Sequence, residues 1–409
     1  MNIVHIIGNG FDLNQGLPTS YAHFYEYYLQ LIPKEGESDS IMRFRELLIE
    51  KLKNEPTEDW ADLEKTMGKL TTEFDKVEDY VNVYLDVYTH LNEYLNMVYK
   101  HSEVQKFDNQ EKTLFADLSQ PWQHLTTADI RRLESIIPIR EDYRVSIINF
   151  NYTDTLYRIS DLSAKEGNAF ARTQYSTAFY DGCKHVHHTL AGNDIILGVD
   201  NAGQIDNTKF RDDERIQNYL IKPQTNSGMG TMIDNVCKSL IDNAHLICIY
   251  GMSIGHTDDT WWQAIGRHFG KNNKVCVVYF PFQKNIANLL PISYNLEWAK
   301  YKRHLMNMMG LKEQEPLQRI FVHFCNRPNY RNIFSNAKRS NLTDNFEDVM
   351  ARFQKNGIIR KPVEKSNDRM SLKLMPPIDD TQFIKPKIYR ERIISYDLHS
   401  NEGMHIKMN

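Results

Sequence analysis

The residues best suited to chemistry lie in four short segments, each of which follows an apolar run of strand length. The first segment contains Gly8, Asn9, Gly10, Phe11 and Asp12, followed closely by Pro18 and Thr19. Glycines there allow positive φ angles and close approach of a ligand, and a following helix would offer N–H groups to an anion. The dinucleotide fingerprint has a third glycine where this chain has Leu13. A nucleotide site and a plain β-turn therefore both stay open.

The second segment places Asn149 and Asn151 at the end of a buried-type run. Ligands bind beyond the carboxyl ends of strands in open parallel sheets. Strand alternation puts the two amides on one side, and an amide can orient a ribose hydroxyl or a water. An Asx turn, with Thr153 or Asp154 capping the next helix, is the structural alternative and is compatible with a ligand role.

The third segment contains His185, His187 and His188. Alternation predicts that His185 and His187 lie on one face of a strand. Two imidazoles are too few to hold a metal, and no carboxylate or cysteine stands at a spacing that completes the set, so no metal is predicted. One histidine acting as a general base is the simpler hypothesis, because the pKa of a free imidazole lies near neutrality.

The fourth segment contains Gly251, Ser253 and Asp258 after another apolar run. Gly251 allows a tight loop against a ligand, and Ser253 can hydrogen-bond a phosphate or a ribose. Asp258 or Asp259 is expected to cap the following helix, while a direct ligand role for either is the weaker alternative. Several strand ends that carry glycine and polar side chains together predict one cleft.

Apolar runs must supply the strands that position these segments. They are Ile3–Ile7, Val145–Phe150, Ile195–Val199, Leu246–Tyr250, Val275–Phe280 and Ile320–Phe324. Most are continuous rather than alternating, which is typical of strands buried on both faces, and helical patterns separate several of them. We therefore predict an α/β fold with a Rossmann-like, mostly parallel sheet.

The first two predicted strands are separated by roughly 130 residues, far more than one crossover helix needs. We predict a core over 1–35 and 138–340, a large helical insertion over 36–137, and a C-terminal helix with an extended tail over 341–409. The expected helices are Tyr21–Ile32, Met42–Leu52, Ala61–Leu70, Val77–Tyr99, Ile130–Ile137 and Thr343–Gln354, the last capped by Thr343. The tyrosine-rich stripe in Val77–Tyr99 is expected to be core.

The composition limits the partners. A formal net charge of −4 gives no general attraction to nucleic acid or to an anionic membrane, so neither is an expected partner. The five cysteines are isolated and are expected to be reduced, mostly buried thiols. The start of the chain lacks a secretory pattern and no run approaches the length of a membrane span, which predicts a cytoplasmic protein.

Together these motifs resemble the bacteriophage abortive-infection family AbiH over roughly residues 1–280, and Trp60–Glu64 is similar to a tryptophan and glutamate element of that family. That family is in turn similar to sirtuin-like domains, which bind NAD. The resemblance implies that Gly8 and Gly10 meet the dinucleotide. It also implies that Asn151 orients the nicotinamide ribose or a water, and that His187 acts as the base.

The same resemblance implies that Gly251 and Ser253 lie around the ribose and phosphates. The sirtuin pattern has glycine after the histidine where this chain has His188, so the choice between His187 and His188 stays open. The implied function is an anti-phage NAD glycohydrolase, with a phage-derived trigger and a homo-oligomer as implied partners. The alternative is a non-catalytic nucleotide-binding sensor or toxin module that acts through a partner.

Overall fold

The computed structural model describes residues 1–54, 62–104, 111–192, 194–282, 291–312, 316–325, 332–335 and 341–360. Within them, seven strands form one sheet in the order β3-β4-β2-β1-β5-β6-β7. The strands are β1 (Asn2–Ile7), β2 (Tyr143–Asn149), β3 (Ala169–Arg172), β4 (Thr177–His185), β5 (Leu246–Tyr250), β6 (Cys276–Phe280) and β7 (Ile320–Val322). Only the β3–β4 pair is antiparallel. The predicted α/β class and mostly parallel sheet are confirmed.

The strand β1 lies at the centre of the sheet, between β2 and β5. Its last residue, Ile7, is level with Asn149 of β2 and with Tyr250 of β5. Because parallel strands end at the same edge, the loops after β1, β2 and β5 leave the sheet side by side. This register brings three of the four segments singled out above to one edge, and the fourth joins them because His185, the last residue of β4, is level with Asn149.

Seven helices lie between β1 and β2 in the described part of the chain: α1 (Gly10–Asn14), α2 (Tyr21–Tyr28), α3 (Asp39–Asn54), α4 (Leu63–Leu70), α5 (Val77–His101), α6 (Glu111–Ser119) and α7 (Thr127–Glu134). The later ones are α8 (Thr155–Arg158), α9 (Glu214–Leu220), α10 (Lys222–Gly228), α11 (Ile233–Asp242), α12 (Asp259–Lys271), α13 (Pro291–Met308) and α14 (Leu342–Lys355). The sequence predicted neither α6 nor separate helices α9 and α10. A helix was expected after Asp154, and α8 begins there, although the Asp154 side chain makes no capping hydrogen bond.

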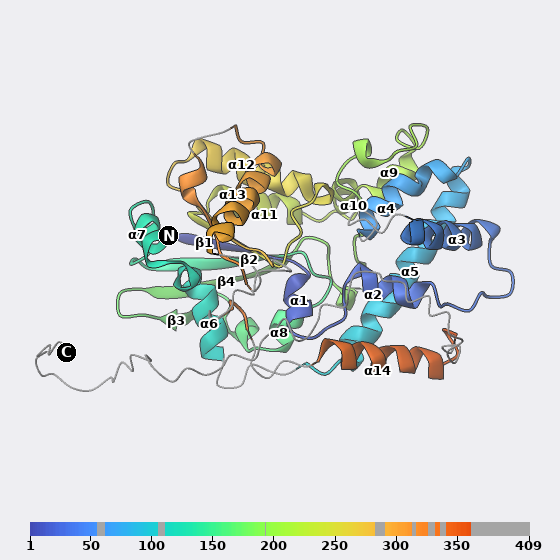
Figure 1. Ribbon diagram of the computed structural model, residues 1–409, viewed down its shortest axis with the longest axis horizontal. Coiled ribbons are helices and arrows are strands. Elements are labelled where there is room, and N and C mark those ends of the chain that lie inside the picture. Colours follow the sequence, from blue (N-terminus) through green and yellow to red (C-terminus); the bar gives the residue numbers. More distant parts are fainter. Residues whose placement is uncertain are drawn as a thin grey trace, which may run out of the picture.

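The helices form three groups around the sheet (Figure 1). One face is covered by α11, α12 and α13, and the other by α6 and α8. A separate apolar core surrounds α5 and includes side chains of α2, α4, α9 and α14. Tyr80, Tyr84 and Tyr94 of α5 are buried in it, which confirms that the tyrosine-rich stripe is core. The domain boundaries at 35, 137 and 340 stay predictions.

The predicted strand Ile195–Val199 is wrong. Its backbone makes only one isolated bridge, between Val199 and Ile221, instead of a ladder in the sheet. The carbonyls of Ile196 and Leu197 accept hydrogen bonds from the hydroxyls of Tyr152 and Tyr84. The run is apolar because it packs in the core around α5, and a buried segment of any backbone conformation gives the same pattern.

Two strands at one side of the sheet, β3 and β4, were not predicted. Exposure alternates along the first half of β4, and its sequence mixes small, polar and aromatic residues, so no continuous apolar run marks it. The strand also ends at His185. Alternation therefore does not continue to His187, and the expectation that the two histidines share a face is wrong.

Helix caps correct two further expectations. Asn341, not Thr343, caps α14, since its side chain accepts hydrogen bonds from the N–H groups of Thr343 and Asp344. The start of α12 is capped from outside, because the Asp200 carboxylate accepts from the N–H and hydroxyl of Thr260. Asp258 occupies the cap position of α12 but makes no capping hydrogen bond.

Some expectations fall outside the described residues, namely Trp60 and Ala61 and the tail over 361–409. Among the residues that the structure does describe, no helix has the length and apolar character needed to cross a membrane. All five cysteines are free, and four of them are buried. This agrees with the expectation of mostly buried thiols.

Candidate functional site

The loops after β1 and β5 are packed directly against each other through their glycines. The N–H of Gly10 donates to the carbonyl of Gly251 over 2.9 Å, and the N–H of Phe11 donates to the carbonyl of Gly8 over 2.9 Å. A Cβ on Gly10 would lie 2.6 Å from the Cα of Gly251. Gly251 itself has a φ of 67°, which favours glycine. These glycines therefore allow the backbones of the two loops to pack closely together.

The rest of the first segment is held by side chains. Asn9 and Thr19 bond reciprocally, with the Thr19 hydroxyl donating to Asn9 Oδ1 over 2.5 Å and Asn9 Nδ2 donating to the Thr19 carbonyl over 3.2 Å. The carbonyl of Pro18 accepts from the hydroxyl of Tyr94 on α5. The helix that follows the glycines is α1, which has only five residues. These contacts hold the segment next to Asp12.

A group of polar side chains gathers beyond the ends of β1, β2 and β4, and we call it the Asp12 cluster. Its members are Asp12, Asn149, Asn151, Thr153, Asp154 and His185. Asn151 Nδ2 and the Thr153 hydroxyl both donate to the Asp12 carboxylate. The Asn149 side chain accepts from the Asn151 N–H over 3.0 Å, so the expected Asx turn is present, formed by Asn149.

Two buried atoms give the Asp12 cluster its chemical character. Burial raises the pKa of Asp12 to about 6, although hydrogen bonds from Thr153 and Thr155 lower it. The other amide atom of Asn151, Oδ1, is buried and has no hydrogen-bond partner among the described residues. A buried acceptor without a donor is costly, which makes Asn151 Oδ1 a natural place for a ligand or water donor.

His185 closes the Asp12 cluster from β4. Its Nδ1 lies 3.0 Å from the carbonyl oxygen of Asn151, and its Nε2 lies 3.0 Å from Asp154 Oδ1. Burial disfavours the imidazolium, but the hydrogen bond to Asp154 leads a set of contacts that raises the pKa of His185 to about 10. His185 is therefore protonated at neutral pH and donates from both nitrogens.

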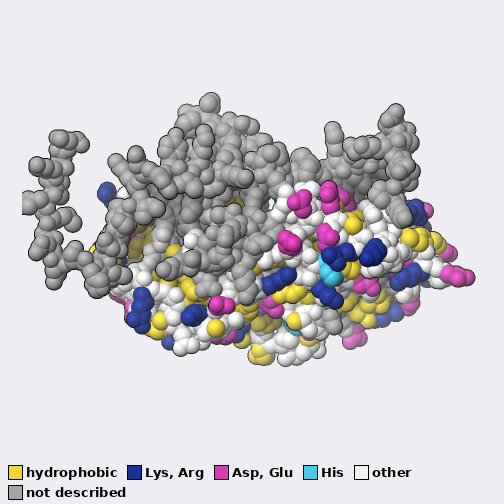
Figure 2. Space-filling view, turned by 90° about the horizontal axis from the view of Figure 1, so that it is seen from below, with side chains coloured by type: hydrophobic (Ala, Val, Ile, Leu, Met, Phe, Trp, Pro, Cys, Tyr) yellow, Lys and Arg dark blue, Asp and Glu magenta, His cyan; other side chains and the backbone are white. Residues whose placement is uncertain are grey.

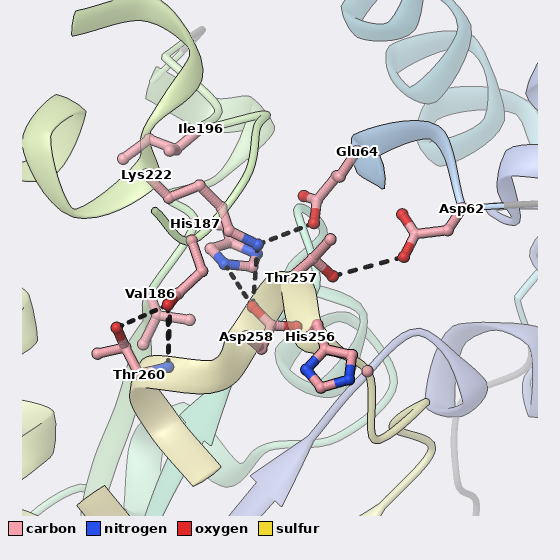
Figure 3. A network of polar contacts seen from close by, with 12 residues as sticks. Asp62, Glu64, Val186, His187, Ile196, Lys222, His256, Thr257, Asp258 and Thr260 are labelled. Atoms are coloured by element: carbon pink, nitrogen blue, oxygen red, sulfur yellow. Dashed lines mark hydrogen bonds and ion pairs between the residues drawn. The ribbon is translucent and has the colours of Figure 1, made fainter. Parts of the chain in front are cut away.

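A second group lies next to it and contains a buried cation, and we call it the Lys222 cluster. Its members are Glu64, His187, Lys222 and Asp258 (Figure 3). The ammonium of Lys222 donates to Glu64 Oε2 over 2.8 Å and to Asp258 Oδ1 over 2.9 Å. The same Asp258 oxygen lies 3.6 Å from His187 Nε2. The cluster thus joins α4 and α10 to the loops after β4 and β5.

In the Lys222 cluster, one ammonium group pairs with two carboxylates. Burial would lower the pKa of Lys222, but the charges of Asp258 and Glu64 raise it above its ordinary value. Burial raises the pKa of Glu64, although the charge of Lys222 opposes this. Burial lowers the pKa of His187 to about 3, and the charge of Lys222 acts in the same direction. His187 is therefore neutral at physiological pH.

The structure also separates His187 from His188. The ring of His187 lies against Phe150 and Tyr152, with centroid distances of 5.3 and 6.1 Å. His188 has a φ of 58° and contacts Asp194 at the surface, with 3.1 Å between Nδ1 and Oδ2. His187 is thus the histidine that belongs to the buried site.

Other predicted site residues lie away from both clusters. The ring of Phe11 is buried in the core on one face of the sheet, against Tyr250 and Phe334. Ser253 is exposed in the loop after β5. Asp258 does reach the site, but as a partner of Lys222. The residues that the structure brings together are therefore Asp12, Asn149 and Asn151 in one cluster, and His187 and Asp258 in the other.

No pattern in the sequence pointed to Lys222 as a site residue. It follows the apolar pair Leu220 and Ile221 and belongs to no motif, and lysine is almost never fully buried unless it is paired. Among the described residues no group of three or more histidine, cysteine, aspartate or glutamate side chains is placed to hold a metal ion. Two cavities, of about 760 and 230 Å³, are lined by residues of neither cluster.

A comparison with protein families agrees with the family resemblance that the sequence motifs indicated. The family model described as bacteriophage abortive infection AbiH matches residues 4–280, which include both clusters. No curated protein matches the chain. Because the family model covers more than half of the 409 residues, the chain belongs to the AbiH family of bacteriophage abortive infection proteins.

Proposed function

We propose that this abortive-infection protein binds NAD, or a related nucleotide, beyond the carboxyl ends of β1, β2 and β5 and hydrolyses its N-glycosidic bond. The observation that carries the proposal is the Oδ1 atom of Asn151, which is buried without a partner in the described part of the chain. It lies at the edge of the sheet where ligands of parallel α/β folds bind. A ribose hydroxyl or a water would satisfy it.

The order of the strands supports a nucleotide as the ligand. Taken by their place in the chain, the parallel strands run third, second, first, fourth, fifth and sixth across the sheet. A Rossmann-like dinucleotide-binding sheet has this order, and its ligand lies where the order reverses. The reversal here is at β1 and β5, where the Gly10 and Gly251 loops meet.

The backbone of His188 supports the resemblance to sirtuin-like domains. The sirtuin pattern has glycine after its histidine, and His188 occupies the corresponding position. A φ of 58° is uncommon for residues other than glycine, although histidine adopts it more often than most, as asparagine and aspartate do. The chain therefore has a glycine-like conformation where that pattern has glycine. This favours His187 as the functional histidine.

The proposed reaction breaks the bond between C1′ of the ribose and the nicotinamide nitrogen. Nicotinamide leaves as a neutral molecule because its ring is cationic in NAD, so the leaving group needs no acid. Water then adds to C1′ of an oxocarbenium-like ribose and loses a proton. Asn151 Oδ1 orients the ribose or this water, and His187, which is neutral, accepts the proton.

The Lys222 cluster determines how a ligand enters. Asn151 and His187 are buried, and the Lys222 to Glu64 contact joins α4 to α10 across the site. In our proposal this contact opens when the nucleotide binds, and Glu64 then becomes exposed to solvent. Phage-triggered activation and assembly into a homo-oligomer stay predictions.

The test is to incubate the purified protein with NAD, with and without phage lysate, and to follow nicotinamide and ADP-ribose. We expect Asn151→Ala and His187→Ala each to lower turnover by about 100-fold or more. A positioned base usually contributes this much, and a misplaced ribose or water costs about as much. Asn235→Ala and His256→Ala, at exposed positions, are the matched controls. Equal turnover in all four variants would exclude these assignments.

A non-catalytic nucleotide sensor is the second candidate. It is favoured by the very low pKa of His187, because a base that holds a proton so weakly contributes little to proton transfer. It predicts no product under any condition, together with an NAD-dependent rise in melting temperature that Asn151→Ala removes. The absence of both product and stabilisation would exclude a nucleotide at this site.

A further inference from the structure

A cavity of about 760 Å³ lies between α5, α14, α3 and the segment after α2. Figure 1 shows α14 alongside α5 at the lower side of the molecule. A volume of 300 to 1,000 Å³ is usual for pockets that bind small molecules. We call it the α5–α14 cavity. None of the residues that line it belongs to the Asp12 cluster or the Lys222 cluster.

The floor of the α5–α14 cavity is apolar. Leu31 and Phe353 are buried there, and Met97 and Ile358 complete it. Backbone hydrogen bonds join the two chain segments that line the floor. The N–H of Ile32 donates to the carbonyl of Ile358 over 3.1 Å, and the N–H of Arg360 donates to the carbonyl of Gln30. The floor is thus preformed, and it would bury the apolar part of a ligand.

The acidic groups that line this cavity already have partners. Glu37 pairs with Arg45 over 3.0 Å, and Arg45 also pairs with Asp86 over 3.1 Å. Glu93 contacts His90, with 3.0 Å between Oε2 and Nδ1. Each of the two lining carboxylates, Glu37 and Glu93, therefore already contacts a basic side chain within the wall.

The basic groups at the entrance are not compensated in this way. Lys34, Lys100 and His101 line the cavity, and no contact within the described ranges pairs any of them with a carboxylate. Both lysines are exposed. Figure 2 shows both basic and acidic side chains near a histidine on the face seen from below. The entrance thus offers positive charge above an apolar floor.

We propose that the α5–α14 cavity binds a small amphipathic anion, with its apolar part on Met97 and Phe353 and its anionic group at Lys34 and Lys100. A mostly apolar pocket with a few polar groups at one end fixes the orientation of such a ligand. Charge complementarity excludes a cationic ligand from the same pose. The site is independent of the proposed nucleotide reaction, and it would allow a second small molecule to bind this protein.

Two fluorescent probes with one aromatic skeleton test this proposal. 8-Anilinonaphthalene-1-sulfonate carries an anionic group, and N-phenyl-1-naphthylamine lacks it. We expect saturable binding of the sulfonate with a stoichiometry of one at this site. We expect at least about tenfold weaker binding of the neutral probe, which corresponds to about 1.4 kcal/mol.

Three variants locate the binding. Met97→Trp fills the floor and should abolish binding of both probes at this site. Lys34→Glu combined with Lys100→Glu should weaken binding of the sulfonate about tenfold and leave the neutral probe unchanged. Lys271→Glu combined with Lys274→Glu is the matched control, because it makes the same change of charge at the end of α12 and in the turn before β6.

The outcomes are distinct. Loss of sulfonate binding in Met97→Trp and in the Lys34 and Lys100 double variant, but not in the control, supports the α5–α14 cavity. Sulfonate binding that survives Met97→Trp, or that both double variants weaken equally, overturns the proposal. Circular dichroism and the melting temperature of each variant show that the chain is folded. NAD turnover is measured in parallel, and its failure leaves this test unaffected.

Discussion

The Asp12 cluster and the Lys222 cluster lie at the same edge of the sheet, but they hold their buried carboxylates differently. Asp12 is surrounded by neutral donors, namely the amide of Asn151 and the hydroxyl of Thr153. Glu64 and Asp258 share the charge of Lys222. The two clusters meet at the end of β4, where His185 belongs to the first and His187 to the second.

This difference determines which protonation states the two clusters permit. Without a directly bonded cation, burial keeps the pKa of Asp12 high, at about 6. With Lys222 present, two carboxylates can be buried together only while the ammonium stays in place. The first cluster is therefore sensitive to pH. The second is sensitive to the loss of one side chain and also to pH, because burial raises the pKa of Glu64 even beside Lys222.

The largest effect is expected from removing that side chain. Lys222→Met leaves Glu64 and Asp258 buried without their cation, which should lower the free energy of unfolding by about 3–5 kcal/mol. Urea unfolding followed by circular dichroism measures the change. Adding Glu64→Gln should recover part of it, because one buried charge is then removed.

The matched control for Lys222→Met is Lys274→Met, at an exposed lysine before β6. It should change the stability by no more than about 0.5 kcal/mol. If Lys222→Met were as mild as the control, the ammonium of Lys222 would not be what holds the two carboxylates in the interior. The comparison between the clusters would then fail.

The next effect concerns pH and the Asp12 cluster. The pKa of Asp12 is raised by burial from 3.8 to about 6, so the protonated form favours folding. The stabilisation is complete below about pH 4 and is lost as the pH rises through about 6, with a total of about 3 kcal/mol. Asp12→Asn, which cannot ionise, should remove this loss.

Urea unfolding between pH 4 and pH 7 tests this, with the difference between wild type and Asp12→Asn as the readout. Asp212→Asn, at an exposed carboxylate, is the control and should follow the wild type. A difference that does not change across this range would show that Asp12 ionises as readily as an exposed aspartate. It would also remove the contrast with the Lys222 cluster.

The sequence predicted the Asp12 cluster better than the Lys222 cluster, for a physical reason. Asp12, Asn149 and Asn151 follow continuous apolar runs, and such runs mark buried parallel strands whose carboxyl ends must meet. β5 and β6 were predicted almost to the residue on the same basis. The position of these side chains thus depends on local pattern and sheet topology alone.

The position of the Lys222 side chain depends instead on partners that are distant along the chain. Lys222 lies 158 positions from Glu64 and 36 from Asp258 along the chain, and no local pattern signals such a contact. The same limit explains the error at Ile195–Val199, where an apolar run packs on α5 rather than in the sheet. Burial can be read from hydrophobicity, whereas the choice of neighbour is decided by the whole fold.

The smallest effect is expected at His188, directly after the residue that enters the Lys222 cluster. Its φ of 58° costs a residue with a side chain about 1–2 kcal/mol. His188→Gly relieves this strain, while its contact with Asp194 is near the surface and contributes little. We expect His188→Gly to lie within about 1 kcal/mol of the wild type, and the β-branched His188→Val to be about 2 kcal/mol less stable.

The same pair of substitutions at His256 is the control, because its φ is not among the positive values found in the described chain. There valine should be at least as stable as glycine, since glycine loses more conformational freedom on folding. The order of valine and glycine should therefore reverse between the two positions. If valine were tolerated equally well at both, the turn that carries His187 into the buried site would not need a glycine-like conformation, and the resemblance at this position would lose its structural support.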